Sequence, residues 1–379
     1  MHVFGIVFEC NPFHAGHAKL IAAARNAGAD YIIGVMSGNF VQRGEPAVLP
    51  KFFRAEELAR QGVDLVVELP VRYALSSAER FAGGAVEILW RLGADTVYFG
   101  SECGDVMKLA QVAEACSDAD VIAKIRKLCE TGLSYPTAQS LVLGQKLGND
   151  YSELLNSPNN ILGVEYIKAI RRLGCRGMSA MTLKREPGGV TAHGVREAAA
   201  EGKIPDGAVS PETAAMLRYG GAVDDAVWSA VALLKLREAD LDSVADSAGG
   251  LGDRIRKAAR ESVSIDQVFG LANTKRYTMS RVKRTVCRAV LGIDGAYPDR
   301  VPYARILAVG AGGTRLLGLL KNKVTIQVSD SLKRLSEAGG NSAKLAAEEC
   351  RATDLYNLVR KEPVRAGEEY FRKLYLVDV

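Results

Sequence analysis

Near the start of the chain stands the sequence Val3-Phe4-Gly5-Ile6-Val7-Phe8-Glu9-Cys10-Asn11-Pro12-Phe13-His14-Ala15-Gly16-His17. The apolar run at its beginning is typical of a buried strand that ends at Glu9, and Asn11-Pro12 predicts a turn. A helix is expected to begin at His14. Such a strand–turn–helix unit brings backbone N–H groups and the positive end of a helix dipole to one place, where they can bind phosphate.

The motif His14-Ala15-Gly16-His17 holds two of the four histidines in the chain. Residues three apart on a helix share one face, so the two imidazoles are expected to lie side by side. A purely structural histidine pair is the alternative interpretation. The neighbouring proline and glycine favour a phosphate-binding site.

The first hundred residues repeat one pattern. Apolar runs that predict buried strands cover residues 2–8, 30–36, 63–69 and 95–99, and amphipathic segments that predict helices cover 16–27, 51–61 and 78–92. Strands that alternate with helices predict right-handed βαβ units and a parallel sheet. Ligands bind such sheets beyond the carboxyl ends of the strands, which indicates a site but not its chemistry. Those ends are residues 9–17, 37–45, 69–70 and 100–102.

Residues 104–173 are expected to be mostly helical. Ser157 and Pro158 have the residue types of an N-cap and a first helical position, and an apolar-periodic segment follows them. The pair Asn159-Asn160 belongs either to the chemistry of this helix start or to a ligand site.

A strand is expected within residues 175–184, followed by a loop that begins at Arg185 and a short helix that contains Arg196. A basic side chain after a late strand of a nucleotide-binding sheet commonly meets phosphates. A solvated surface arginine is the alternative.

From residue 205 the character of the sequence changes. Pro205-Asp206-Gly207 predicts a boundary between residues 1–204, which hold the sheet, and residues 205–379, which are mostly helical. Helices are expected at 211–220, 225–238, 253–261, 276–292 and 341–362, and one more strand at 323–327. The glycines at 310–313 lack the spacing of a dinucleotide-binding motif and predict a loop before a helix.

One segment of the second half is strongly basic. It contains six basic residues and no acidic one: Lys275, Arg276, Arg281, Lys283, Arg284 and Arg288. Arg281, Arg284 and Arg288 recur at helical spacing and should line one helix face. That face suits the phosphate backbone of a nucleic acid, and a solvated basic surface is the alternative.

Composition narrows the class of protein. The net charge of +5 is mild, and no apolar run approaches the roughly 20 residues that cross a bilayer. The N-terminus does not resemble a signal peptide, and the seven cysteines are scattered without metal-ligand spacing. We therefore expect a cytoplasmic protein with no membrane association and no protein-bound metal site.

The motif His14-Ala15-Gly16-His17 resembles the HxGH signature of the nucleotidyltransferase superfamily, which has a Rossmann-like α/β fold. Asn11 stands where many small-molecule members have aspartate. That variant resembles a narrower family, the bacterial tRNA(Met) cytidine acetate ligases. Further blocks that are similar to this family occur in order at 37–47, 51–54, 62–70, 99–102, 157–166 and 274–277.

This resemblance implies a parallel nucleotidyltransferase sheet, with ATP bound in residues 1–204 and tRNA bound by residues 205–379. It implies activation of acetate as acetyl-adenylate, with release of pyrophosphate. The acetyl group would then pass to N4 of the wobble cytidine of elongator tRNA(Met), with release of AMP. Mg²⁺ is expected on the phosphates of ATP.

The resemblance also implies site residues. His14 and His17 would be catalytic, and Arg196 would contact phosphate. ATP would be bound by Val7, Phe8, Glu9, Cys10, Asn11, Pro12, Phe13, His14, Ala15, Gly16, His17, Ala18, Lys19, Leu20, Gly100, Asn159, Asn160 and Arg185. The tRNA would contact Lys275, Arg276, Arg281, Lys283, Arg284 and Arg288.

Two departures from the family pattern concern Cys10, where an aromatic residue is usual, and the segment 191–196, whose hydroxyl groups are displaced. Two other functions stay open at this point. One is a small-molecule adenylyl- or cytidylyltransferase, and the other is a non-catalytic RNA-binding protein on the same scaffold. The sequence leaves the oligomeric state open.

Overall fold

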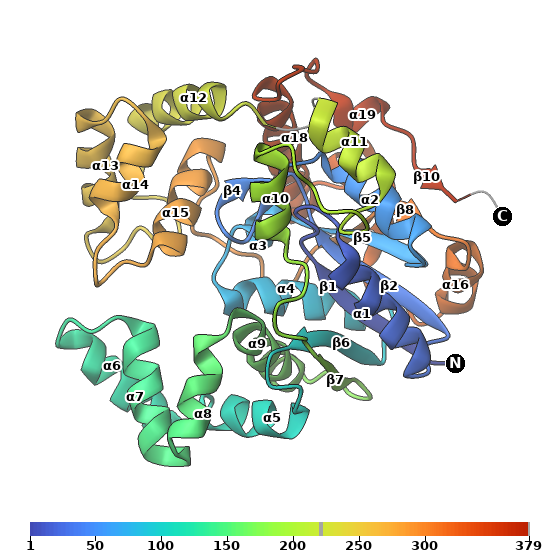
Figure 1. Ribbon diagram of the computed structural model, residues 1–379, viewed down its shortest axis with the longest axis horizontal. Helices are drawn as coiled ribbons and strands as arrows, with labels where there is room; N and C mark the ends of the chain where they lie inside the picture. The colour runs from blue at the N-terminus through green and yellow to red at the C-terminus, as the bar shows by residue number, and fades with distance from the viewer. Residues whose placement is uncertain (220–222, 378–379) are drawn as a thin grey trace.

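The computed structural model describes residues 1–219 and 223–377. Its centre is a sheet in which five strands run parallel in the order β5, β2, β1, β6, β7 (Figure 1). These strands are β1 (Val3–Phe8), β2 (Tyr31–Ser37), β5 (Leu65–Leu69), β6 (Thr96–Ser101) and β7 (Ser179–Lys184). The sequence-based prediction of a parallel α/β sheet with these five strands is confirmed. The strand predicted at 323–327 is wrong, because only Gln327 of that range lies in a strand, which continues to Ser329.

Helices cover both faces of this sheet because strands buried on two sides need apolar partners on each. On one face α1 (Ala15–Asn26) and α2 (Lys51–Arg60) pack in a core with β1 and β2. On the other face lie α4 (Ala78–Arg91) and α9 (Pro158–Arg172). Both faces are sealed by hydrophobic side chains, so the accessible part of the sheet is its edge at the strand ends.

The sheet is completed by strands from the end of the chain. β8 (Tyr303–Val309) runs antiparallel beside β5, and β9 (Gln327–Ser329) and β10 (Tyr375–Leu376) pair with β8. The sequence did not predict β8. The division at 204/205 therefore does not separate sheet from helices, because the sheet takes strands from both sides of it.

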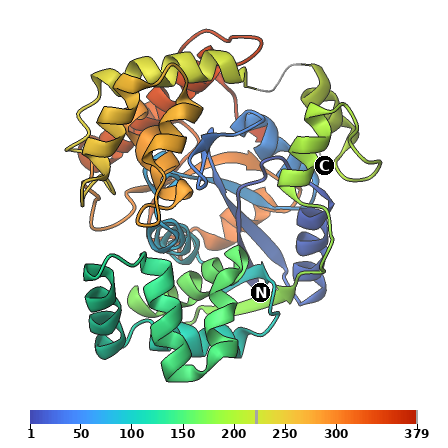
Figure 2. The ribbon, with the colours of Figure 1, turned by 60° about the vertical axis from the view of Figure 1, so that its left-hand side comes forward.

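The remaining helices form two groups. Between β6 and β7 lie α5 (Val106–Ala115), α6 (Ala119–Glu130), α7 (Tyr135–Leu147) and α8 (Asn149–Glu153), followed by the single turn η1 (Leu154–Asn156). The second group is α12 (Asp225–Glu238), α13 (Leu251–Glu261), α14 (Ile265–Ala272) and α15 (Met279–Leu291). Figure 2 shows the two groups on either side of α4.

The α12–α15 group shares a hydrophobic core with the rest of the molecule. Phe40 and Val71 from the first hundred residues belong to this core, as do Ala352 and Tyr356 near the C-terminus. Consequently these helices are not an independent domain.

Shorter elements and the C-terminal helices complete the chain. They are β3 (Phe40–Val41), β4 (Glu45–Pro46), α3 (Val71–Ala74), α10 (Ala192–Ala200), α11 (Pro211–Tyr219), α16 (Gly313–Leu320), α17 (Leu332–Glu337), α18 (Gly340–Leu358) and α19 (Glu368–Phe371). Residue 220 of the predicted helix 211–220, and residues 378–379 of the predicted helical part, lie outside the described residues. Among the helices that are described, none is both long and apolar enough to cross a bilayer.

Candidate active site

A cavity of about 370 Å³ opens at the carboxyl ends of the parallel strands. Twelve of the residues predicted from the sequence lie on its wall: Val7, Phe8, Glu9, Cys10, Asn11, His14, His17, Leu20, Gly100, Asn159, Arg185 and Arg196. The topology explains this convergence, because the parallel strands end at one edge of the sheet.

The histidines lie at the start of α1. His14 is the N-cap residue, and its Nδ1 accepts a hydrogen bond from the N–H of Gly16 (3.0 Å). His17 closes a capping box, because its Nδ1 accepts from the N–H of His14 (3.2 Å). The ring centroids are 4.0 Å apart, as the spacing predicts.

The electrostatics of the two rings follow from these contacts. Burial, with the Arg185 guanidinium nearby, lowers the pKa of His14 to about 4. Burial, then His14 and Arg185, hold the pKa of His17 well below its usual value. Both rings are therefore neutral at pH 7. Since each Nδ1 accepts a hydrogen bond, the ring proton resides on Nε2, and each histidine has an Nε2–H to donate.

Some residues of the predicted ATP set do not reach the cavity wall: Pro12, Phe13, Ala15, Gly16, Ala18, Lys19 and Asn160. Lys19 forms an exposed ion pair with Glu186 (2.8 Å). A Cβ on Gly16 would lie 2.8 Å from Cε1 of His14. The glycine thus makes room for the His14 imidazole.

The two asparagines at the start of α9 have different positions. Asn159 lies on the cavity wall and donates from Nδ2 to Glu102 Oε1 (2.6 Å). Asn160 is buried and accepts from the N–H of Cys103 (3.1 Å). The second oxygen of Glu102 accepts from the backbone N–H of Asn160 (3.0 Å), a cap that Ser157 does not provide. Asn159 is therefore the one available to a ligand.

Thr191 is the N-cap of α10, and Arg196 lies in the middle of the same helix. Arg196 reaches back across the cavity, where its Nη1 donates to the carbonyl of Asn11 (2.6 Å). Thr191 caps α10, since its Oγ1 accepts from the N–H of Gly194 (3.1 Å). A hydroxyl thus lies at the cavity after all, at a helix N-terminus.

Eleven further residues of the cavity wall had no predicted ligand role: Gln42, Arg43, Phe81, Phe99, Glu102, Pro158, Leu162, Tyr166, Thr191, Ala192 and His193. Gln42 and Arg43 belong to the β3–β4 hairpin, which follows β2. They and Glu102 lie within the strand ends 37–45 and 100–102, where the sequence predicted a site without assigning these side chains to it. Phe81, Phe99 and Tyr166 give no signal of a site, because their sequence pattern is that of core residues.

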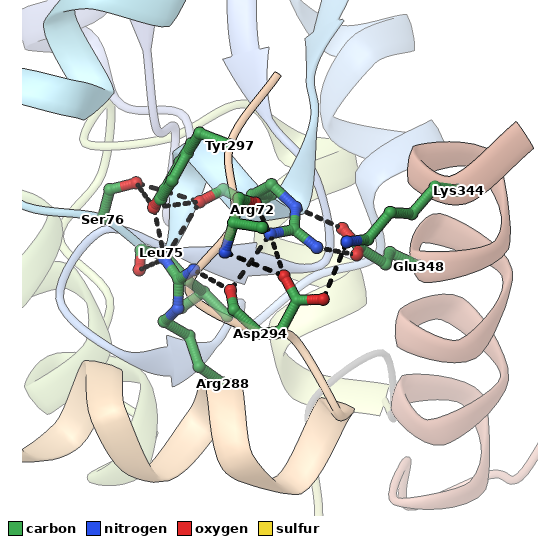
Figure 3. Close-up of polar contacts among 9 residues, drawn as sticks. Arg72, Leu75, Ser76, Arg288, Asp294, Tyr297, Lys344 and Glu348 are labelled. Atoms are coloured by element: carbon green, nitrogen blue, oxygen red, sulfur yellow. Dashed lines mark hydrogen bonds and ion pairs between the residues drawn. The ribbon is translucent and has the colours of Figure 1, made fainter. Parts of the chain in front are cut away.

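The helix α15 differs most from expectation. Arg288 is fully buried, and its guanidinium donates to the carbonyls of Arg72, Leu75 and Asp294 and to Tyr297 (Figure 3). It cannot lie on an RNA-facing surface, so we remove it from the predicted tRNA contacts. The spacing predicted three arginines on one face of α15, but this face turns inward at Arg288.

Figure 3 also shows what Arg288 supports. Arg72 pairs with Asp294 (2.7 Å) and with Glu348 of α18, and Lys344 pairs with Asp294 (2.7 Å). These contacts join α3, the segment after α15, and α18. Arg288 is a structural residue of this buried network.

The other basic residues of the segment are more accessible. Arg284 is mostly buried, and Arg281 donates to the carbonyl of Asp246 (2.9 Å). Lys283 pairs with Glu45 of the hairpin (3.6 Å), while Lys275 and Arg276 are exposed. Arg276, Arg281 and Arg284 also line a second cavity of about 790 Å³ that α7 and α9 border. Arg281 and Arg284 therefore face this cavity, whereas Arg288 faces the interior.

Comparison with known proteins defines the class first. The family model described as HIGH Nucleotidyl Transferase matches residues 1–369, which makes the chain a HIGH nucleotidyl transferase. The tRNA(Met) cytidine acetate ligase of Syntrophotalea carbinolica is 36% identical over 363 residues, covering 88% of this chain and 86% of the relative. That of Thermoanaerobacter sp. is 32% identical over 400 residues, covering 99% of both chains.

A solved structure agrees with these relatives. The crystal structure of Thermotoga maritima TmcAL bound with alpha-thio ATP has a TM-score of 0.90 and 28% identity, and the match covers 99% of this chain and 100% of that one. The chain therefore belongs to the tRNA(Met) cytidine acetate ligase family, a family of ligases.

Proposed function

We propose that this chain uses ATP to activate acetate and transfers the acetyl group to N4 of the wobble cytidine of elongator tRNA(Met). The observation that carries the proposal is the cavity itself, where the His14–His17 pair meets Gly100, Asn159 and Arg185 at the strand ends. The relatives that bear this activity in their names match nearly the whole chain. The histidine pair supports chemistry at a phosphate.

In the first step an acetate oxygen attacks the α-phosphorus of ATP and pyrophosphate leaves. Acetate is ionised at neutral pH, so this step needs no general base. It needs alignment of the reactants and stabilisation of charge on the phosphoryl oxygens. The Nε2–H groups of His14 and His17 supply two donors, and Arg185 and Arg196 supply positive charge.

In the second step N4 of cytidine attacks the acetyl carbon, and AMP leaves. The cytosine amine is a weak nucleophile, which is why acetate must be activated first. Exposed Lys275 and Arg276, with Arg281 and Lys283, would bind the tRNA backbone. Their affinity should fall steeply with salt.

Mg²⁺ fits the cavity only as an ion brought by the substrate. The described residues contain no group of three or more side chains suited to hold a metal. Of the two cavity carboxylates, Glu102 has both oxygens bound by the start of α9, and Glu9 has one oxygen bound by the N–H of Gln42 and a single oxygen left. The phosphates would therefore be its main ligands, and it would neutralise their charge.

The test combines the purified chain with ¹⁴C-acetate, ATP, Mg²⁺ and elongator tRNA(Met). We expect label in N4-acetylcytidine at the wobble position, and none without ATP. A small-molecule transferase would consume ATP with a phosphate acceptor and leave the tRNA unlabelled. A non-catalytic binder would retain tRNA without consuming ATP. Either result would contradict the proposal.

A further inference from the structure

The active-site cavity has two sides, which the strand order separates. β1 is central, with β6 and β7 on one side and β2 on the other. Gly100, Asn159 and Arg185 stand on the β6–β7 side, whereas Gln42 and Arg43 of the hairpin stand on the β2 side. If ATP occupies the β6–β7 side, the β2 side is left for the nucleophile that attacks the activated acetyl group.

Glu9 lies at the junction of the two sides, directly after β1. Its Oε1 accepts from the N–H of Gln42 (2.6 Å), and its carbonyl accepts from Nη1 of Arg54 (2.6 Å). The side chain is thus held toward the hairpin. Within residues 1–219 and 223–377, no hydrogen bond reaches Oε2, and Glu9 lines the cavity.

The carboxylate on the other side of the cavity provides a contrast. Both oxygens of Glu102 are occupied, by the side chain of Asn159 and the N–H of Asn160. Of the two glutamates on the cavity wall, Glu9 is the one with an oxygen left for substrate.

From this geometry we propose that Glu9 is the catalytic base of the acyl transfer: its Oε2 accepts a hydrogen bond from the N4 amine of the acceptor cytidine and then its proton. The inference rests on the proposed function. The first step has no proton to remove, so it gives Glu9 no such role. Glu9 was expected from the family resemblance only as one of many ATP contacts.

The step balances as follows. The N4 lone pair forms a bond to the acetyl carbon, and the bond from that carbon to the AMP oxygen breaks. AMP leaves with the electron pair. One N4 proton passes to Oε2 of Glu9 and from there to solvent. No oxidant, reductant or further reactant is needed.

The surroundings of Glu9 suit a proton acceptor. Burial raises the pKa of Glu9 above its usual value, and the charge of Glu45 raises it further. The N–H of Gln42 and the charges of Arg43 and Arg54 lower the pKa but do not cancel the effect of burial. The Tyr166 hydroxyl and the Cys10 thiol also lie near the carboxyl group. A carboxylate with a raised pKa is a stronger base.

The test separates the two steps with Glu9→Gln. Glutamine keeps an oxygen for the N–H of Gln42, so the hairpin contact can persist. Acetate-dependent exchange of labelled pyrophosphate into ATP reports the first step, and N4-acetylcytidine measured by mass spectrometry reports the second. We expect exchange to fall less than about threefold and acetyl transfer to fall roughly 100-fold or more.

Further measurements and variants sharpen the test. Acetyl-adenylate supplied directly should not rescue acetyl transfer by Glu9→Gln, and Glu9→Asp should restore part of it. In wild type the single-turnover transfer rate should rise with pH through one ionisation, which Glu9→Gln abolishes. The matched control Glu102→Gln should differ from Glu9→Gln, because it should weaken ATP binding and the exchange of pyrophosphate into ATP.

Normal transfer by Glu9→Gln, rescue by acetyl-adenylate, or equal loss of both steps would each overturn the assignment. A wild-type chain that makes no N4-acetylcytidine at all would instead overturn the proposed function. The two failures are therefore distinguishable.

Discussion

The imidazoles of His14 and His17 are uncharged hydrogen-bond donors at neutral pH. Their proton positions follow from the backbone N–H groups that each Nδ1 accepts. Gly16 matters here because a side chain at that position would collide with the His14 ring. The glycine of the HxGH motif thus makes room for the first histidine of the same motif.

We expect the His14 ring to stay neutral until the pH falls to about 4, because burial and Arg185 disfavour its charge. NMR of ¹⁵N-histidine-labelled protein, assigned with His14→Gln and His17→Gln, would measure this. It would also show Nε2 as the protonated nitrogen. A His14 ring that titrates near its ordinary value of 6.5 would contradict the electrostatics described.

The same shift affects stability. Between about pH 6.5 and pH 4 the unfolded chain takes up a proton at His14 that the folded chain does not. The free energy of unfolding should therefore fall as the pH falls through this window. His14→Gln should reduce that slope in urea denaturation. An unchanged slope would show that His14 is not the group responsible.

At the scale of elements, the β3–β4 hairpin joins the cavity to α15. Gln42 contacts Glu9 at one end, and Glu45 pairs with both Arg196 (3.7 Å) and Lys283 (3.6 Å). Between them Gly44 has a φ of +80° and packs directly on the backbone of α15. The hairpin position, and with it one wall of the cavity, depends on this close contact.

Gly44→Ala should displace the hairpin. A Cβ there would lie 2.8 Å from the Lys283 Cβ and closer still to the Arg284 backbone, and φ is unfavourable for alanine. We expect a loss of several kcal/mol of stability, as for overpacked sites, and a matching loss of acetyl transfer. Gly132→Ala is the control, because its φ is +97° with nothing within 4 Å. Equal effects of both would refute the packing argument.

Substitutions of the arginines in and near α15 should have two kinds of effect, one on stability and one on tRNA binding. Arg288→Ala leaves three buried carbonyls without their donor and should lower stability by at least about 1–3 kcal/mol in urea denaturation. Arg276→Ala removes an exposed charge, so the fold should persist while tRNA affinity and its dependence on salt both decrease. Filter binding at several salt concentrations measures the latter. Unchanged binding by Arg276→Ala would exclude that residue from the RNA contacts.

At the scale of the whole molecule, a buried ionic cluster joins the C-terminal segment to the sheet. Glu369 of α19 pairs with Lys51 of α2 (2.5 Å) and Arg305 of β8 (2.6 Å). Glu68 of β5 pairs with the same two cations. The cluster holds β8 beside β5, so it fixes a strand pairing that the sequence did not predict.

Glu369→Gln should therefore destabilise the entire fold, by about 3–5 kcal/mol, because Lys51 and Arg305 lose a buried partner. Burial alone would raise the pKa of Glu369, but Lys51 and Arg305 outweigh it and lower the pKa from 4.5 to about 2. Its stabilisation is thus present above pH 4.5 and disappears as the pH falls toward 2. The exposed residue Glu337 offers the control Glu337→Gln, which should change little. Equal effects would contradict the role of the cluster.

How much of this structure the sequence predicts depends on how far apart the contacting residues are along the chain. The strands β1, β2, β5 and β6 and their helices follow from local periodicity, and the histidine site follows from a local motif. β8 carries Arg305 amid apolar residues, and its pairing partners Glu68 and Glu369 lie far away in the sequence. Local patterns do not contain that information.

Whether a helix face points to solvent or to the interior is also not determined by local sequence. Helical spacing places Arg281, Arg284 and Arg288 on one side of α15, but whether that side faces solvent depends on Arg72 and Tyr297 elsewhere in the chain. Aromatic cavity residues such as Phe99 have the same ambiguity, since core and cavity wall require the same residue type. Tertiary contacts decide both.

The central claim is that acetate attacks the α-phosphorus of ATP at the His14–His17 site before it reaches the tRNA. Acetate labelled with ¹⁸O in both oxygens tests this most directly, with ATP, Mg²⁺ and elongator tRNA(Met), and AMP analysed by mass spectrometry. We expect one ¹⁸O in each AMP, because the bridging oxygen of acetyl-adenylate stays with AMP when the acyl bond breaks. AMP without ¹⁸O, or ¹⁸O in pyrophosphate or orthophosphate, would contradict the account.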